Sequence, residues 1–401
     1  MDDISVLICD DSALMRNLIA RIIDGTEGMT VIAKAQNGQV ALERLADPNI
    51  KPDVMVLDIE MPVMNGIEFL KERKARKIDV PVVVLSSIAT KGAAVTMQAL
   101  ELGAADFITK PNGSVSADIS EIADRLIDMI ASYGYTYARR KKKQTYIPEF
   151  FQRQRKLLQA ESSVAKIKAT NFDEPIQKPK LDVAQIRSFN TIEKKEPAII
   201  KPVREGGKID LIALGISTGG PNALRSVFKM IDPHLKQPIL VVQHMPKGFT
   251  KAFADSLDKI CPLSVKEAED GDKIEDGHVY IAPGDNHIVV EARFNGNVIR
   301  LSQEPPRNVH RPSADVMFES VAKVYKNHAL GVIMTGMGRD GAAQLAEMRK
   351  EGAWTLGQDE ESSIVYGMPR AAWEMGAVQK QVSLMNMADA ISSVARAHLT
   401  N

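Results

Sequence analysis

Five polar side chains in the first third of the chain each follow an apolar run of sequence: Asp10, Asp11, Asp58, Ser86 and Lys110. If the runs are parallel strands, their carboxyl ends meet at one edge of a sheet, where ligands of open α/β sheets bind. Three carboxylates that lie close together at this edge repel one another, and Mg²⁺ is the cation expected to neutralise them. Asp58 could then accept a phosphoryl group, with Ser86 and Lys110 contacting its oxygens.

Each of these residues also has a structural explanation. A single aspartate after a strand is usually a turn or helix N-cap residue, and a single Lys-Pro step is usually a turn. Five such residues at four strand ends favour a functional cluster over coincidence. The sequence therefore predicts a magnesium-dependent phosphoryl-transfer site.

A glycine-flanked serine marks a second cluster. Ser217 lies in Gly-Ile-Ser-Thr-Gly-Gly between an apolar run and a helical pattern, the setting in which G-x-S-x-G presents a nucleophile. His244 and Asp340 each lie just past a later apolar run. The three residue types suit a nucleophile, its base and the carboxylate that orients the base. The backbone N–H groups of Thr218 and Met337 are predicted to form the oxyanion hole.

This second cluster has alternatives too. Ser217 could cap a helix or belong to a phosphate loop, although no Gly-Lys-Ser/Thr follows it. His244 could be a satisfied core or loop histidine, and Asp340 a helix cap. Three complementary side chains at strand ends favour hydrolysis. Their order along the chain, Ser then His then Asp, differs from that of α/β-hydrolases.

The elements that must position the first cluster alternate between strand and helix patterns over about 130 residues, which predicts a doubly wound (βα)5 α/β domain. We place this domain at residues 1–132. The expected strands are Val6–Cys9, Thr30–Ala35, Val54–Leu57, Val82–Leu85 and Ala105–Ile108, and two of the expected helices are Leu14–Ile23 and Gly38–Leu45.

Residues 133–207 are predicted to be a flexible linker, because they are polar and proline-rich and have little apolar periodicity. The basic run Arg139–Lys143 is read as the solvated start of this linker rather than an anion contact. A second, larger α/β domain with a doubly wound, mostly parallel sheet is expected over 208–398. Its predicted strands are Leu211–Leu214, Ile239–Val242, His278–Ile281, Ile288–Glu291, Ala329–Met334 and Ala353–Leu356.

The composition limits the classes of function. The chain has 401 residues, with 51 Lys and Arg against 51 Asp and Glu, and this neutrality argues against nucleic-acid binding. All seven histidines lie in the second half, so a histidine base can act only there. Cys9 and Cys261 are too few for a disulfide framework. The acidic N-terminus and the lack of a long apolar run predict no membrane insertion and a cytoplasmic location.

The first cluster resembles the receiver domain of two-component response regulators over residues 4 to about 130. The resemblance rests on Asp10-Asp11, Asp58-Ile59-Glu60-Met61-Pro62 with Gly66, Ser86 and Lys110-Pro111. It implies that a histidine kinase phosphorylates Asp58. It also implies that Asp10, Asp11, Asp58 and the backbone carbonyl of Glu60 hold Mg²⁺.

The second cluster resembles the chemotaxis protein-glutamate methylesterases of the CheB family over about 209–395. The matching motifs are residues 215–220, Gln243-His244-Met245-Pro246, Gly248-Phe249-Thr250, Ala282-Pro283-Gly284 with His287, Arg311-Pro312-Ser313 with Asp315, 335–341 and Tyr366-Gly367-Met368-Pro369. The resemblance implies a Ser217, His244 and Asp340 triad that hydrolyses glutamate methyl esters on cytoplasmic chemoreceptor helices and deamidates certain glutamines, without a cofactor for the hydrolysis.

The resemblance also implies that the unphosphorylated receiver packs over the catalytic face. The predicted linker is longer than is usual in that family, so this packing is an open question at the level of sequence. Arg311 and the loop around His310 are candidates for substrate or interdomain contact, with ordinary structural roles as the alternative. Two other functions also stay open: a hydrolase of another protein ester, and a phosphorylation-gated binding protein.

Overall fold

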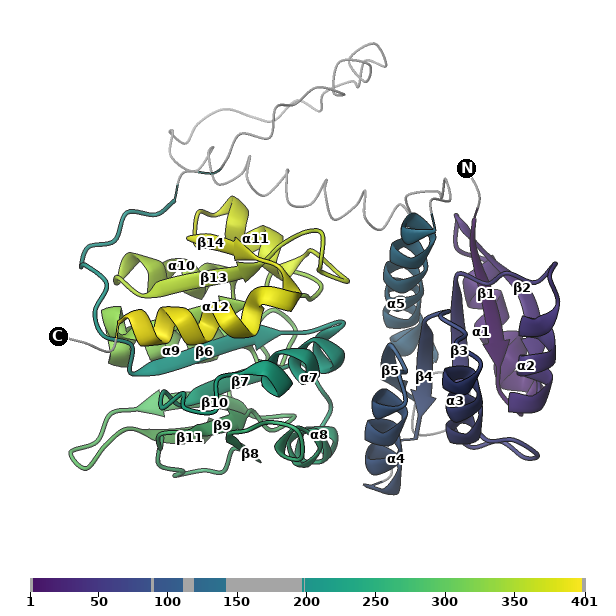
Figure 1. Cartoon of the computed structure of the whole chain (residues 1–401), viewed down its shortest axis with the longest axis horizontal. Helices are drawn as coiled ribbons and strands as arrows, with labels where there is room; N and C mark the ends of the chain where they lie inside the picture. The colour runs from purple at the N-terminus through teal and green to yellow at the C-terminus, as the bar shows by residue number, and fades with distance from the viewer. Residues whose placement is uncertain (1–2, 88–89, 111–118, 142–196, 198, 399–401) are drawn as a thin grey trace, which may run out of the picture.

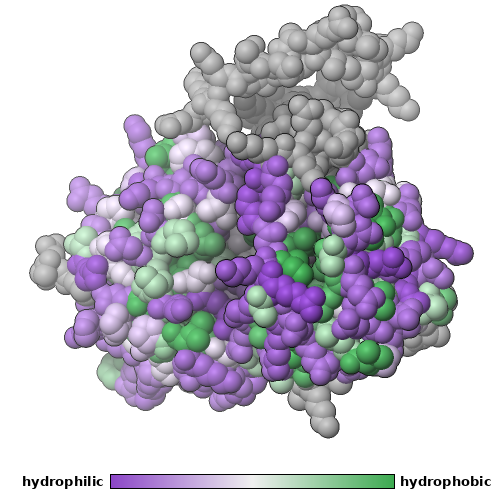
Figure 2. Space-filling view, turned by 45° about the vertical axis from the view of Figure 1, so that its right-hand side comes forward, coloured by the Kyte–Doolittle hydropathy of each residue, from purple (hydrophilic) through white to green (hydrophobic). Residues whose placement is uncertain are grey.

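The computed structural model describes residues 3–87, 90–110, 119–141, 197 and 199–398, which form two α/β domains (Figure 1). This confirms the predicted fold class. No helix in the described part of the chain is both long and apolar enough to cross a membrane. Hydrophilic residues predominate on the face drawn in Figure 2, where hydrophobic residues form small groups.

The N-terminal domain has a five-stranded parallel sheet in the order β2-β1-β3-β4-β5. Its strands β1, β3 and β4 are almost entirely buried, because helices cover both faces of the sheet. Each predicted strand is present within one or two residues. The elements are β1 Ile4–Cys9, α1 Ala13–Asp24, β2 Met29–Ala35, α2 Gly38–Ala46, β3 Val54–Asp58, α3 Gly66–Ala75, β4 Val82–Ser86, α4 Thr90–Glu101, β5 Asp106–Thr109 and α5 Ile119–Arg140.

Helix α5 continues to Arg140, beyond residue 132, where the sequence analysis ends the first domain. Tyr133 and Ala138 are buried, so apolar packing extends the helix into the segment predicted as linker. Most of that predicted linker, including Lys142 and Lys143 of the basic run, lies outside the described residues.

The predicted linker also ends earlier than expected. Backbone N–H groups of Ile200, Val203 and Gly207 donate to carbonyls of the C-terminal domain, at distances of 3.0, 2.8 and 3.0 Å. The segment 199–207 is therefore part of the surface of that domain.

The C-terminal domain has a seven-stranded sheet in the order β14-β13-β12-β6-β7-β9-β8, and all its strand pairs are parallel. The predicted strand Ile288–Glu291 is instead part of an antiparallel hairpin, β10-β11, outside this sheet. The strands are β6 Leu211–Ile216, β7 Ile239–Gln243, β8 Ser264–Glu267, β9 His278–Ile281, β10 His287–Glu291, β11 Val298–Ser302, β12 Ala329–Ile333, β13 Trp354–Gln358 and β14 Lys380–Val382.

Helices cover both faces of the seven-stranded sheet (Figure 1). They are α7 Gly220–Met230, α8 Phe249–Asp258, α9 Ala314–Tyr325, the short 3-10 helix η2 Lys326–His328, α10 Ala342–Lys350, α11 Met368–Glu374 and α12 Leu384–Ala397.

The two domains pack against each other through β5 and α4 on one side and α7 and α8 on the other. The buried ring of Phe107 in β5 stacks on that of Phe249 in α8, with ring centroids 4.9 Å apart. One hydrophobic cluster contains residues from both domains. The domains therefore share apolar packing in this structure.

Candidate active site and phosphorylation site

Three adjacent strands of the C-terminal domain bring the predicted catalytic residues together. Strands β12, β6 and β7 are neighbours in the sheet, and the loops that follow them carry Asp340, Ser217 and His244. Because the strands are parallel, these loops meet at one edge, outside the carboxyl ends. Residues separated by up to 123 positions in the sequence thus become neighbours.

The three side chains form a hydrogen-bonded chain. Nδ1 of His244 lies 3.1 Å from Oγ of Ser217, and Nε2 lies 2.9 Å from Oδ2 of Asp340. With Nε2–H donating to the carboxylate, Nδ1 has a free lone pair for the hydroxyl proton. The arrangement has the relative geometry of a nucleophile, general base and orienting carboxylate.

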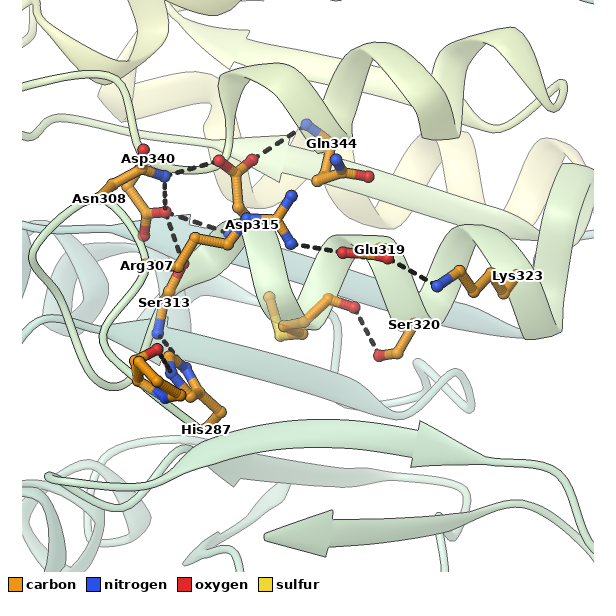
Figure 3. Close-up of polar contacts among 12 residues, drawn as sticks. His287, Arg307, Asn308, Ser313, Asp315, Glu319, Ser320, Lys323, Asp340 and Gln344 are labelled. Atoms are coloured by element: carbon orange, nitrogen blue, oxygen red, sulfur yellow. Dashed lines mark hydrogen bonds and ion pairs between the residues drawn. The ribbon is translucent and has the colours of Figure 1, made fainter. Parts of the chain in front are cut away.

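Asp340 is buried but has many hydrogen-bond donors around it. Oδ1 accepts from Ser313 Oγ at 2.6 Å and from Asn308 Nδ2 at 2.8 Å, and Oδ2 accepts from the Ala314 N–H at 2.6 Å. Figure 3 shows Asn308 between Asp340 and Asp315, at the N-terminal end of α9. The positive end of the helix dipole favours a carboxylate in this position.

These donors decide the protonation state of Asp340. Burial by itself would raise the pKa of the carboxyl, but the hydrogen bond and charge of His244, with Ser313 and Asn308, hold it well below its ordinary range. A permanently ionised carboxylate keeps the His244 ring in the tautomer that leaves Nδ1 free.

The backbone at the nucleophile is tightly constrained. The Ser217 N–H donates to the Thr335 carbonyl at 3.0 Å, and Gln243 Nε2 donates to the Ser217 carbonyl at 3.1 Å. A Cβ atom at Gly336 would lie 2.8 Å from the Ser217 Cβ, so only glycine lets this loop approach so closely. Sequence analysis did not assign Gln243 a role, although it lies directly before His244.

The predicted oxyanion-hole donors are available for a ligand. Among the residues that the structure describes, the backbone N–H groups of Thr218 and Met337 have no hydrogen-bond partner. Both residues line the same cavity as Ser217. Two free N–H groups beside a nucleophile can stabilise the oxyanion of a tetrahedral intermediate.

This cavity has a volume of about 750 Å³ and lies between the domains. Residues of β5 and α5 form one wall, and the triad with its surrounding loops forms the other. The first group comprises Asp106, Phe107, Asp124, Arg125, Asp128 and Met129. The N-terminal domain therefore forms part of the cavity that contains Ser217.

Polar contacts between the domains accompany the apolar packing. Oδ2 of the buried Asp106 accepts from the Gly219 N–H at 2.9 Å. Nδ2 of Asn222 donates to the carbonyls of Ala104 and Ala105, at 2.8 and 3.0 Å. Sequence analysis assigned no function to Asp106 or Asn222, because nothing in either sequence segment indicates what will lie opposite.

The phosphorylation-site cluster also assembles in the N-terminal domain. One carboxylate oxygen from each of Asp10, Asp11 and Asp58 lies within 4.8 Å of the other two. Lys110 Nζ lies 2.7 Å from Oδ2 of Asp58 and 3.3 Å from Oδ2 of Asp10. Hard oxygen donors at this separation fit Mg²⁺, which binds through carboxylates and water.

The charges of this cluster perturb one another. Burial raises the pKa of Asp58, although the nearby Lys110 ammonium partly opposes this effect. Burial alone would lower the pKa of Lys110, but the charges of Asp58 and Asp10 raise it. Lys110 thus offsets only part of the negative charge of the three carboxylates, and a divalent ion would reduce the remaining repulsion.

Ser86 and Glu60 lie beside this cluster. Both line a small cavity with Asp58 and Lys110. The Ser86 hydroxyl is 2.5 Å from Oγ1 of Thr96 in α4, so it is bound to the helix rather than to Asp58 in this structure.

Comparisons with known proteins agree with this two-part organisation. A CheB methylesterase family model matches residues 212–391, and a response regulator receiver domain model matches residues 6–119. A protein-glutamate methylesterase/protein-glutamine glutaminase of Treponema denticola is 53% identical over 393 residues, which cover 98% of each chain. A protein of the same name from Treponema pallidum is 48% identical over 403 residues, covering 98% of this chain and 97% of the relative.

A solved structure also matches the second half of the chain. The CheB methylesterase catalytic domain of Thermotoga maritima is 36% identical, covers 47% of this chain and 98% of its own, and superposes with a TM-score of 0.45. The family assignment rests on the near-complete match to the two Treponema proteins. The chain belongs to the CheB methylesterase family, with a response regulator receiver domain at its N-terminus.

Proposed function

We propose that this protein hydrolyses the methyl esters of glutamate side chains on chemoreceptors and deamidates specific receptor glutamines, under the control of phosphorylation at Asp58. The proposed catalytic residues are Ser217, His244 and Asp340. The observation that carries the proposal is their hydrogen-bonded chain beside two backbone N–H groups that bond to no residue in the described ranges.

The reaction proceeds through an acyl-enzyme. His244 Nδ1 takes the hydroxyl proton as Ser217 Oγ attacks the ester carbon, and the N–H groups of Thr218 and Met337 bind the oxyanion. The same imidazole then gives its proton to the leaving methoxide, which departs as methanol. Water, activated by His244, attacks the glutamyl ester and frees both Ser217 and the glutamate carboxylate. With a glutamine substrate the leaving group is ammonia.

Methanol release from methylated receptor membranes tests this mechanism. We expect Ser217→Ala to reduce release at least about 10³-fold, because the acyl-enzyme can no longer form. Ser393→Ala, an exposed serine of α12, is the matched control and should keep full activity. Equal release by the wild type and Ser217→Ala would remove Ser217 from the mechanism. Parallel assays of ammonia release from glutamine-bearing receptors compare the two reactions.

The N-terminal domain acts as the switch in this proposal. A histidine kinase supplies the phosphoryl group to Asp58, and Asp10, Asp11, Asp58 and the Glu60 carbonyl hold the Mg²⁺ that neutralises the site. Lys110 contacts the phosphoryl oxygens. The Ser86 hydroxyl gives up its contact with Thr96 and contacts the phosphoryl oxygens as well. The walls of the interdomain cavity support a gating role, because α5 and β5 stand in front of the triad.

Substitution of the acceptor tests the switch. We expect a small phosphodonor such as acetyl phosphate, with Mg²⁺, to raise the esterase activity of the wild type but not that of Asp58→Asn. Asp53→Asn, at the residue directly before the same strand, should still respond. Activation that survives in Asp58→Asn, or that needs no Mg²⁺, contradicts the proposed switch.

A further inference from the structure

A tight turn, Arg307–His310, lies against the catalytic histidine, and no step of the proposed reaction uses it. The Arg307 N–H donates to the His310 carbonyl at 3.1 Å, and the His310 N–H donates back to Arg307 at 3.0 Å. The two residues between them, Asn308 and Val309, have φ angles of 52° and 60°. These are the left-handed conformations of a type I′ turn.

Val309 is an unfavourable residue for that conformation, because a β-branched side chain with positive φ clashes with its own backbone. Its side chain is 89% exposed, so burial does not compensate for the strain. Strain of this kind persists only where surrounding contacts impose it, and it is concentrated at functional sites. The contacts that impose it here come from the neighbours of Val309.

Those neighbours hold the catalytic pair. Asn308 Nδ2 donates to Asp340 Oδ1 and to Asp315 Oδ2. The ring of His310 is stacked on that of His244, with ring centroids 3.8 Å apart and 20° between the planes. Within the described part of the chain, no hydrogen bond joins the His310 ring to another residue, so hydrogen bonding does not fix the ring and the stack on His244 is a direct contact with the catalytic histidine.

The stack restrains a motion that the triad hydrogen bonds do little to prevent. The hydrogen bonds of His244 to Ser217 and Asp340 act at the edge of the ring, in its plane, and they resist displacement of the ring perpendicular to that plane only weakly. Such a displacement carries the Nδ1 lone pair out of line with the Ser217 hydroxyl. A flat ring packed on the face of the imidazole opposes this motion.

The stacked partner also has to be neutral when His244 becomes an imidazolium. Burial, together with the charge of His244, lowers the pKa of His310 from 6.5 to about 4. Two stacked cations would repel each other, whereas a neutral ring stacks favourably on a cationic one.

We propose that His310 is a positioning residue, whose flat, uncharged ring holds the plane of the His244 imidazole in line with Ser217 and Asp340. This inference rests on the proposed function. It adds a fourth side chain to the machinery, one that reaches the substrate only through His244.

Three substitutions at His310 distinguish the effect of a flat ring from the effect of side-chain volume alone. His310→Phe keeps a flat uncharged ring, His310→Leu keeps volume without flatness, and His310→Ala keeps neither. The assay uses the full chain, activated with a saturating phosphodonor and Mg²⁺, and measures kcat and KM separately on methylated receptor membranes. Thermal unfolding of each variant shows that it is folded, and Val309→Gly, which relieves the strained φ, is the control for the turn itself.

We expect His310→Phe to stay within about threefold of the wild-type kcat. Leucine and alanine should lower kcat on the order of 10- to 100-fold, the usual cost of misplacing a catalytic group, with KM nearly unchanged. The NMR resonance of the His244 Nε2–H proton should stay in place in the phenylalanine variant and broaden in the other two.

Three results would overturn the inference: a wild-type kcat in folded His310→Ala, a phenylalanine variant as impaired as the alanine variant, or a leucine variant as active as the phenylalanine variant. None of these results bears on the proposed hydrolysis, which is contradicted if Ser217→Ala releases methanol like the wild type.

Discussion

At the scale of single residues, the environment of Asp340 explains how a buried carboxylate can orient a base. Taking a charge out of water is costly, and the cost is offset only when hydrogen bonds surround the charge. Ser313, Asn308 and the N–H of Ala314 supply these bonds in addition to His244. The carboxylate is thus fixed in position and in charge before any substrate binds.

Asp340→Asn should therefore lower kcat by about 10³- to 10⁴-fold at neutral pH, as expected when the histidine takes the wrong tautomer. The new amide can donate to Nε2, which places the ring proton on Nδ1 and removes the lone pair that Ser217 needs. Steady-state methanol release measures the effect, with Asp389→Asn on the exposed face of α12 as control. A loss of less than tenfold would show that Asp340 does not orient the base.

Residue types and motifs were sufficient to predict Ser217, His244 and Asp340 and to indicate Thr218 and Met337. The structure brings these five together, and their catalytic roles stay a prediction. The sequence could not predict that Nδ1 faces the serine and Nε2 the aspartate, because this depends on the direction from which β7 and β12 present their loops.

At the scale of elements, the order of strands decides which loops meet. Buried strands were predicted within one or two residues because their apolar runs are continuous. The strands β8, β11 and β14 were not predicted. They are three to five residues long and include polar residues such as Lys266, Arg300 and Gln381, so no apolar run marks them.

The first turn of α7 links the catalytic and regulatory parts. Its residue Asn222 donates to two carbonyls just before β5, and the preceding Gly219 donates to Asp106. Because α7 begins just after Ser217, the N-terminal domain is held next to the nucleophile. Asp106 is buried, so its contact with Gly219 is shielded from water. The same burial raises the pKa of the Asp106 carboxyl.

We predict that Asn222→Ala raises the esterase activity of the unphosphorylated protein by roughly three- to tenfold, since a lost hydrogen bond of about 0.5–1.5 kcal/mol shifts the domains toward separation. Activity with phosphodonor and Mg²⁺ should not change. Ser226→Ala on the same helix is the control, because its exposed hydroxyl donates to the Asn222 carbonyl within α7 and not to any described residue of the N-terminal domain. Unchanged basal activity in Asn222→Ala would argue against a closed resting state.

At the scale of the whole molecule, the long predicted linker raised the question of whether the domains can pack together. The structure has them packed, with Phe107 stacked on Phe249 and a shared hydrophobic cluster. Lengthening the linker weakens such packing only slightly, because the entropic cost of bringing its two ends together grows with the logarithm of its length. Contacts at the interface, rather than linker length, then decide closure.

The cavity between the domains should make closure depend on pH. Burial, with the charge of Asp124, raises the pKa of Asp128 from 3.8 to about 7. A carboxyl group with a raised pKa stabilises the closed state while it is protonated, and this contribution is lost as the pH rises through about 7. We therefore expect the domains to separate more readily at pH 8 than at pH 6.

Small-angle X-ray scattering of the unphosphorylated chain between pH 6 and 8 measures this separation. The radius of gyration should increase across the range in the wild type and much less in Asp128→Asn, which stays neutral. The exposed Asp389→Asn should behave like the wild type. A pH-independent radius in the wild type would rule out Asp128 as the controlling group.

The sequence by itself determined the two α/β domains, and it predicted the type of each chemical site and the residues that could serve it. It could do so because apolar periodicity and local motifs depend on near neighbours in the chain. Only the tertiary structure decided the orientation of the His244 ring, the contacts of Asn308 and His310 with the catalytic pair, and the packing of β5 and α5 over the nucleophile. These features depend on side chains distant in sequence, whose encounter is set by strand order and by the interface between domains.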